Sequence, residues 1–176
     1  MPITRQPVNV PAAMCEAYDY ARPCAFSRAL EVALPGATMI FVSGTASVGS
    51  KGENLHVGDF RAQARRAFEN ARAVLRQAKA DWHDVVKVTI FIKDIAAHYG
   101  AFNEVRNEFF RKMALPFYPA STCVEARLCR EELLVEMELI AVLADDRHAA
   151  GGEEQAPQDF NRARGRRKGI VPCSVQ

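Results

Sequence analysis

The hydrophobic residues of this 176-residue chain recur with helical spacing in two places, and each place predicts a helix. The clearer one begins after Asp59, a residue type that caps helix N-termini. Its apolar positions form one continuous helical face: Phe60, Ala64, Ala67, Phe68, Ala71, Val74, Leu75 and Ala78. A second helix is predicted after Asp94 and before Pro116. Its buried stripe would consist of Tyr99, Phe102, Val105 and Phe109.

Five other segments have the patterns of strands. Residues 25–34 and 38–43 flank a Pro-Gly turn signal and predict a β-hairpin that Gly44 ends. Residues 85–92 are β-branched with almost no polar break, as in an internal strand. Residues 121–128 and 133–143 complete the set. In the last strand, Glu136 and Glu138 share the face opposite to its apolar residues.

The element order β-β-α-β-α-β-β predicts a two-layer α+β domain, a mixed sheet with two helices on one face. The other sheet face would still carry apolar side chains, so we expect another subunit to cover it. We assign residues 25–144 to this domain and residues 1–24 to an irregular N-terminal extension. Residues 145–176 are predicted to be a disordered tail, because the apolar pattern ends there.

Composition narrows the class of protein. The hydrophobic content is 49% and the net charge is only +2, so nothing global indicates nucleic acid or a membrane surface as a partner. The basic cluster at residues 162–168 is interpreted as a solvated tail, with a nucleic-acid or targeting patch as the alternative. The start has no signal-peptide pattern, and no apolar run could span a bilayer. Five cysteines without a CxxC pair and four scattered histidines predict no metal site, so we expect a reduced, cytoplasmic, soluble protein.

Several stretches then occur in a diagnostic order: FVSG at 41–44, GDFRAQ at 58–63, DVVKVTIFIKD at 84–94, PASTCVE at 119–125 and LVEMELIA at 134–141. With them the chain resembles the Rid family (reactive-intermediate deaminases, also called RidA, YjgF or endoribonuclease L-PSP) over residues 25–143. The resemblance implies a chorismate-mutase-like fold and a homotrimer with clefts between subunits. It also implies hydrolysis of reactive 2-imino or 2-enamino acids to 2-oxo acids and ammonia, without a metal or an organic cofactor.

The resemblance also implies site residues. Glu136 corresponds to the glutamate that positions water or transfers protons, and is the candidate catalytic residue. Gly44 and Cys123 correspond to pocket positions, and Phe26 lies near the position of the aromatic residue that lines the pocket. Ser121 stands where deaminating members have the arginine that binds the substrate carboxylate in a bidentate pair.

Two arginines are candidates to replace that carboxylate contact. Strand alternation places Ser121, Cys123 and Arg127 on one face, with Arg127 roughly 20 Å from Ser121. Arg127 could therefore bind an acid that is larger or differently placed. Arg28, in the first predicted strand, is the second candidate.

Simpler structural roles remain open for two of these residues. Glu136 could form an interfacial ion pair with Arg127 or Arg28, and Cys123 could be a small packing residue, since no histidine is near it in the strand pattern.

The main functional hypothesis is a hydrolase of a reactive enamine or imine, or of a related small carboxylate. One alternative is a non-catalytic metabolite-binding or regulatory trimer. Another is a chorismatase-like hydrolase of a cyclic carboxylate, because SGTAS at 43–47 and STCVEARL at 121–128 resemble chorismatases. An endoribonuclease is disfavoured, because the domain has neither a basic stripe nor a histidine acid–base pair.

Overall fold

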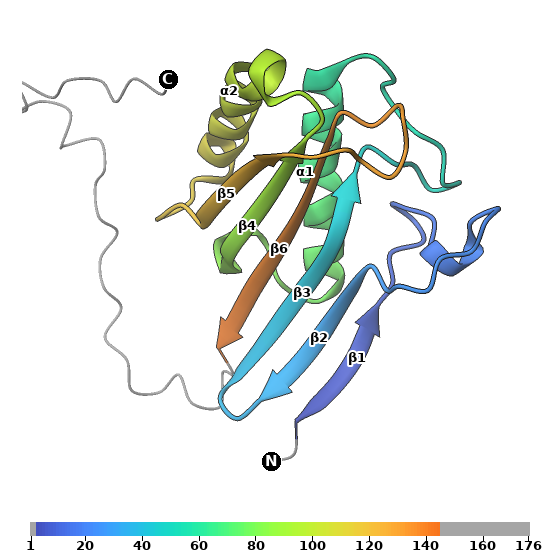
Figure 1. Cartoon of the computed structure of the whole chain (residues 1–176). Helices are drawn as coiled ribbons and strands as arrows, with labels where there is room; N and C mark the ends of the chain where they lie inside the picture. Colours follow the sequence, from blue (N-terminus) through green and yellow to red (C-terminus); the bar gives the residue numbers. More distant parts are fainter. Residues whose placement is uncertain (1–2, 145–176) are drawn as a thin grey trace, which may run out of the picture.

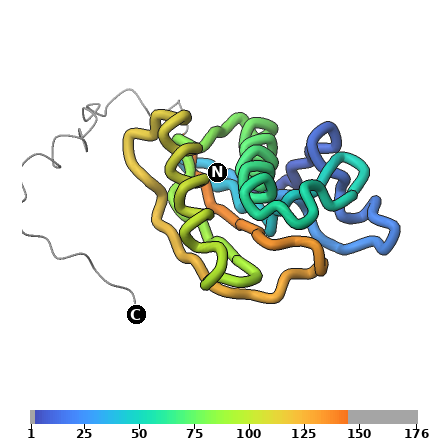
Figure 2. The backbone as a smooth tube through the Cα atoms, turned by 90° about the horizontal axis from the view of Figure 1, so that it is seen from above, coloured from blue at the N-terminus to red at the C-terminus, as the bar shows by residue number. Residues whose placement is uncertain are grey.

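The computed structural model describes residues 3–144, in which six strands form one sheet with two helices packed on one face (Figures 1 and 2). The strands are β1 (Thr4–Val8), β2 (Ala29–Leu34), β3 (Ala37–Ala46), β4 (Val85–Ile92), β5 (Ala120–Glu125) and β6 (Val135–Ala144). The helices are α1 (Phe60–Gln77) and α2 (Ile95–Met113), with short 3-10 helices at Ala17–Asp19 and Trp82–Asp84. Strand order is β1-β2-β3-β6-β4-β5, and only the β4–β5 pair is parallel. The predicted α+β class with a mixed sheet is confirmed.

Both helices bury one face against the sheet, although one predicted position in α2 is wrong. All eight predicted apolar positions of α1 are buried, and the Asp59 carboxylate accepts a hydrogen bond from the Ala62 amide at 2.9 Å, as a helix cap does. In α2 the stripe does not include Tyr99, which is 43% exposed. The ring of His98 occupies the contact position instead and stacks on Phe60 with 4.3 Å between ring centroids. No helix within residues 3–144 is long and apolar enough to cross a membrane.

The prediction of an irregular segment over residues 1–24 is wrong for β1, which pairs antiparallel with β2 from Thr4↔Ala33 to Val8↔Ala29. As an edge strand, β1 tolerates Pro7, and four of its five side chains are exposed. It therefore lacks the alternation that marks a half-buried strand. The predicted disordered tail and its basic cluster lie outside the described residues.

Two predicted strand ends also differ. The strand predicted over 121–128 stops at Glu125, because its partner β4 ends at Ile92, directly opposite Glu125. Gly44, predicted to end β3, lies inside it. Register runs from Val42↔Leu139 to Thr45↔Met137, so two residues of β3 lie opposite one of β6. This is a β-bulge, which kinks the strand and lets it continue to Ala46.

Three loops meet at the end of the sheet beyond this bulge, and buried side-chain amides of α1 hold two of them, the β3–α1 and β5–β6 loops. The three loops are the segment between β1 and β2, the loop between β3 and α1, and the β5–β6 loop (Figures 1 and 2). The Asn70 side chain donates to the carbonyls of Ala46 and Val48, both at 2.9 Å. The Gln63 side chain donates to the Glu132 carbonyl at 2.8 Å and accepts from the Leu134 amide at 2.9 Å. Both amides are therefore satisfied despite complete burial.

Candidate functional site

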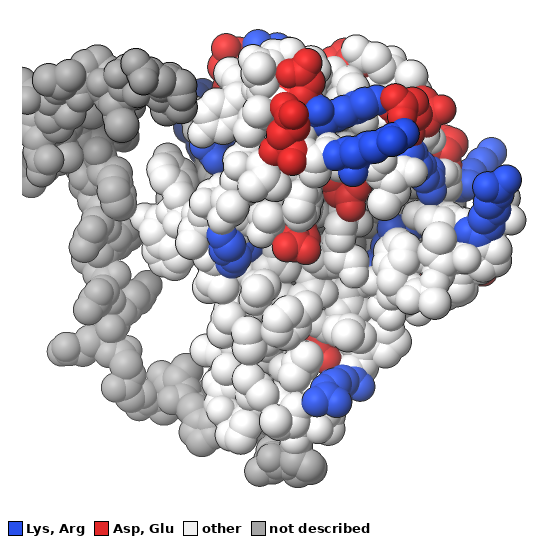
Figure 3. Space-filling view, in the orientation of Figure 1, with Lys and Arg blue, Asp and Glu red and all other residues white. Residues whose placement is uncertain are grey.

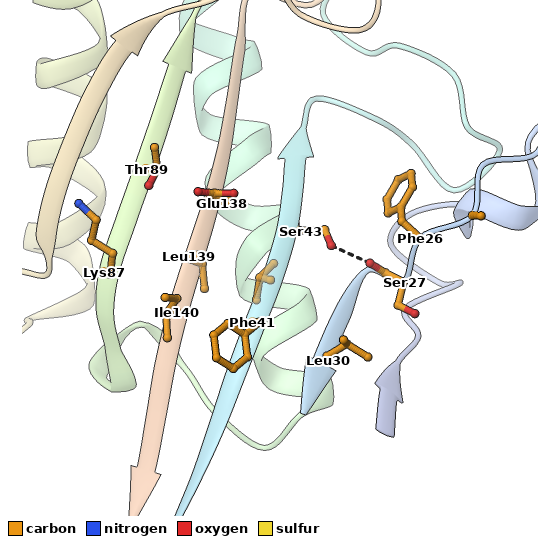
Figure 4. Close-up of a pocket in the computed structure, with 12 residues that line it drawn as sticks. Phe26, Ser27, Leu30, Phe41, Ser43, Lys87, Thr89, Glu138, Leu139 and Ile140 are labelled. Carbon is orange, nitrogen blue, oxygen red and sulfur yellow. Dashed lines mark hydrogen bonds between the residues drawn. The ribbon is translucent and has the colours of Figure 1, made fainter. Parts of the chain in front are cut away.

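Two hollows adjoin at Phe26. The sheet hollow, about 730 Å³, lies on the open face of the sheet, opposite the helices, with Leu30, Phe41 and Ile140 on its floor and Glu138 to one side (Figure 4). The end cavity, about 630 Å³, lies among the three loops. Lining residues of the end cavity include Tyr20, Phe26, Arg28, Gly44, Arg130 and Glu136. The predicted Phe26, Arg28, Gly44 and Glu136 are thus brought together, although they come from three distant parts of the chain.

The bulge in β3 makes room for the Glu136 carboxylate. Ala46 pairs with Glu136, and the strand kink places Gly44 beneath the glutamate side chain. A β-carbon at position 44 would overlap Oε1 of Glu136 and lie 3.0 Å from its carboxyl carbon. Any larger residue at position 44 would therefore displace the carboxylate. Glycine is required here for space and not for a left-handed backbone, since Gly44 is not among the described residues with positive φ.

The electrostatic surroundings favour a carboxyl group that can hold a proton. Burial raises the pKa of Glu136, and the negative charge of Glu138 raises it further. Arg130 and Arg28 act in the opposite direction and lower this pKa, but the net direction is upward. A carboxyl group with a raised pKa can both accept and return a proton nearer to neutral pH.

Arg28 is a buried cation in the end cavity. Only 3% of the residue is exposed, and its guanidinium donates to the carbonyl of Cys15 (3.1 Å from Nε) and to the Tyr20 hydroxyl. Its guanidinium carbon also lies over the Tyr20 ring, 5.3 Å from the centroid, and 5.4 Å from that of Phe26. These partners fix the position of the guanidinium and are all neutral.

Arg130, which sequence reasoning missed, is the second guanidinium of the cavity. It lies in the β5–β6 loop, and its Nη1 donates to the Gly52 carbonyl at 2.6 Å and to Oδ1 of Asn54 at 2.9 Å. Its guanidinium carbon lies 4.8 Å from the centroid of Tyr20. A single charged residue in a predicted turn has no periodicity, so only the folded loops reveal its place in the site.

The remaining predicted site residues lie elsewhere. Ser121 pairs with Val88 and Cys123 with Ile90, and because paired residues share a sheet face, both side chains point toward the helices. Arg127 lies beyond the end of β5 and lines neither hollow. Burial raises the pKa of the Cys123 thiol, against a smaller lowering by Arg106. A thiol with a raised pKa is a poor nucleophile, and Cys123 packs against the hydrophobic core.

Comparison with known proteins identifies the family of this chain. The family model described as endoribonuclease L-PSP matches residues 22–143, well over half of the chain. The chain belongs to the endoribonuclease L-PSP family. This family is also called Rid or YjgF, so the membership predicted from the sequence motifs is confirmed. Among residues 3–144, no cluster of three or more histidine, cysteine or acidic residues could hold a metal ion.

Individual relatives of the family agree with this assignment. A RutC family protein of Pyrococcus abyssi is 34% identical over 116 residues, which are 66% of this chain and 84% of the relative. The 2-iminobutanoate/2-iminopropanoate deaminase of Salmonella typhimurium is 33% identical over 105 residues, 60% of this chain and 80% of that enzyme. The crystal structure of Escherichia coli TdcF with bound serine matches with a TM-score of 0.64 and 27% identity, over 79% of this chain and 99% of TdcF.

At the Ser121 position, a neighbouring guanidinium is present. Nη1 of Arg106, from α2, donates to the Ser121 hydroxyl at 3.3 Å, while its Nη2 donates to Asn103 at 2.6 Å. This arginine lies on the helix side of the sheet, whereas Glu136 lies on the open side. Any role of Arg106 would therefore differ from that of Arg28.

The contact between Gly44 and Glu136 generates a stability prediction. Gly44→Ala should displace the Glu136 carboxylate, and because this is the end of a flexible side chain the free energy of unfolding should fall only by about 0.5–1.5 kcal/mol, the cost of a strained rotamer. In a Glu136→Ala background the same substitution should cost little, because the overlapping carboxylate is gone. Urea unfolding of the four proteins measures this coupling.

The matched control is Gly100→Ala in α2, where an added β-carbon meets nothing within 4 Å. It should stabilise the protein by about 0.5–1 kcal/mol, the helix-propensity gain of alanine over glycine. An equal cost of Gly44→Ala with and without Glu136 would show that the glutamate does not lie over position 44.

Proposed function

We propose that the protein hydrolyses a reactive imine or enamine of a small carboxylate metabolite in the end cavity. The supporting observation is the half-buried Glu136 carboxyl, whose pKa is raised, held over Gly44 beside the buried cation Arg28. The Salmonella relative, a 2-iminobutanoate/2-iminopropanoate deaminase, and the serine bound to TdcF support a small amino-acid-like ligand.

In the proposed reaction Glu136 carries two protons in turn from oxygen to nitrogen. Its ionised carboxylate accepts a proton from water as the water oxygen bonds to the imine carbon and the C=N π electrons move to nitrogen. The protonated Glu136 then gives its proton to that nitrogen. The ionised Glu136 next accepts the remaining proton of the hydroxyl group and gives it to the amine nitrogen, so that the C–N bond breaks, ammonia leaves and the oxygen electrons form the C=O group. An enamine must first gain a proton at carbon, and Glu136 can also supply that proton.

Arg28 is the better of the two predicted replacements for the family's carboxylate contact. It lines the same cavity as Glu136, which Arg127 does not. Cys15 and Tyr20 hold its Nε and Nη2 groups, so a carboxylate would meet Nη1 of a cation that is already fixed in place. The substrate carboxylate would thus bind on the open side of the sheet, away from Ser121.

Ammonia release from freshly generated 2-iminopropanoate or 2-iminobutanoate tests this function. Glu136→Gln keeps the size of the side chain but cannot accept the proton, so kcat/KM should fall about 10²–10⁴-fold. Glu69→Gln, on the exposed side of α1 and outside the cavity lining, is the control and should retain the activity.

Three outcomes would count against the proposal. If the unaltered protein does not accelerate ammonia release over buffer, the hydrolase is excluded and the metabolite-binding trimer becomes the better hypothesis. If the unaltered protein is active and Glu136→Gln is equally active, Glu136 is not the proton carrier. Loss of activity in Arg106→Gln, with Arg28→Lys still active, would move the carboxylate contact to the Ser121 position.

The proposal includes a homotrimer in which another copy covers the sheet hollow. Leu30, Phe41 and Ile140 stand opposite one another on three adjacent strands, and Leu30 and Phe41 are each about two-fifths exposed. Much of this face has no charged side chains in the space-filling view (Figure 3). An apolar row of this kind on a sheet face is typical of an interface.

Light scattering of the full chain measures the assembly. The unaltered protein should have three times the mass of one chain, and Phe41→Lys should dissociate it by burying a charge. Thr4→Lys, on the exposed edge strand β1, is the control and should leave the mass unchanged. A monomeric unaltered protein would contradict the trimer.

A further inference from the structure

We infer that the end cavity selects a dicarboxylate, with Arg28 binding the carboxylate next to the reacting carbon and Arg130 binding a second carboxylate. The inference deepens the proposed function and rests on it for the role of Arg28. The observation that supports it is an excess of fixed positive charge inside one cavity.

Cations outnumber acids among the described residues that line the end cavity. The cations are Arg22, Arg28, Lys51 and Arg130, and the acids are Glu53 and Glu136. Within residues 3–144, neither Arg28 nor Arg130 has a carboxylate within ion-pair distance, 4.0 Å. The two carboxylates that follow Arg130 in sequence have other partners: Glu131 pairs with Lys93 at 2.7 Å, and Glu132 accepts from the Asn54 side-chain amide at 2.9 Å.

A guanidinium that has lost water without gaining an anion is costly. Arg28 is buried and Arg130 is half-buried, so the cost is larger for Arg28. The partners of both arginines are carbonyl, amide and hydroxyl oxygens, which hold the groups in place but carry no negative charge. A single monocarboxylate would neutralise only one of the two arginines. A ligand with two carboxylates would neutralise both.

Hydrogen-bonding capacity leads to the same ligand class. Arg28 uses its Nε and Nη2 groups in hydrogen bonds to protein, so its Nη1 group has no partner within the described part of the chain. Arg130 uses only Nη1, so its Nε and Nη2 groups have none there. A guanidinium edge with two N–H groups suits bidentate binding of a carboxylate. Because both guanidiniums lie against the Tyr20 ring, their positions are fixed before a ligand arrives.

The size and lining of the cavity also suit a ligand longer than a three- or four-carbon acid. Its volume of about 630 Å³ is within the range of pockets that hold drug-sized molecules. Met14, Phe26 and Leu133 offer apolar wall between the charged groups. A carbon spacer between two carboxylates would lie against this wall while its ends reach the two arginines.

Two five-carbon oxo acids that differ only at the far end test the inference. They are 2-oxoglutarate, which has a second carboxylate, and 2-oxopentanoate, which has a methyl group there. Calorimetric titration of the full chain should show 2-oxoglutarate binding at least about ten-fold more tightly, the effect of one charge-assisted hydrogen-bonded pair. In Arg130→Gln the two affinities should become equal, through loss of 2-oxoglutarate affinity alone.

Arg130→Lys and Arg127→Gln separate a ligand contact from a structural effect. Arg130→Lys retains the charge without the planar fork and should keep part of the preference, whereas Arg127→Gln, outside the cavity, should keep all of it. Thermal unfolding confirms that each variant is folded. Equal affinities in the unaltered protein, or a preference that survives Arg130→Gln, would overturn the inference.

Ammonia-release assays on the same variants keep the two proposals distinguishable. Tight, Arg130-dependent binding of 2-oxoglutarate without imine hydrolysis would remove the hydrolase and leave the dicarboxylate site. Hydrolysis of imines with no preference for the second carboxylate would support the hydrolase and remove the dicarboxylate site.

Discussion

The carboxylate of Glu136 lies over Gly44, in a position that a β-carbon at residue 44 would overlap. The bulge that brings Gly44 under the glutamate also carries β3 on to Ala46, whose carbonyl accepts from the buried Asn70. Gly44, the β3 bulge and the Asn70 side chain are therefore structurally linked, and together they position the Glu136 carboxyl group and the neighbouring loop. A change in any of them would alter the position of Glu136 and the shape of the cavity together.

Burial and charge act on this carboxyl group in opposite directions. Burial and Glu138 favour its protonated form, and the two arginines favour its ionised form. A substrate carboxylate that neutralises Arg28 would weaken one of the effects that keep Glu136 ionised. Ligand binding would thereby raise its pKa further and favour the protonated state needed to release ammonia. In the proposed reaction, substrate binding and proton transfer would be coupled through the shared arginine.

Much of the fold follows from local pattern, whereas the site follows only in part. The apolar residues of α1 recur at the helical spacing and those of β6 at every second residue, so the buried face of each element can be predicted from the sequence. Strand β1 escapes this reasoning, since an exposed edge strand with a proline has no alternation to detect. Family motifs indicate Glu136, Gly44 and Phe26, and the search for a replacement carboxylate contact adds Arg28; the fold brings these four together. The motifs do not indicate Arg130, because its place depends on three loops meeting, and they group Ser121 and Cys123 with residues from which the sheet separates them.

The most direct test of this account is a titration of the Glu136 carboxyl carbon by NMR in the full chain. The pKa should lie above the ordinary glutamate range, as burial demands, and Glu138→Gln should lower it by removing a like charge. Glu69→Gln removes the same charge from the exposed side of α1 and should leave the midpoint unchanged. A Glu136 pKa at or below the ordinary range, unmoved by Glu138→Gln, would contradict the central claim that this carboxyl group is held, desolvated, over Gly44.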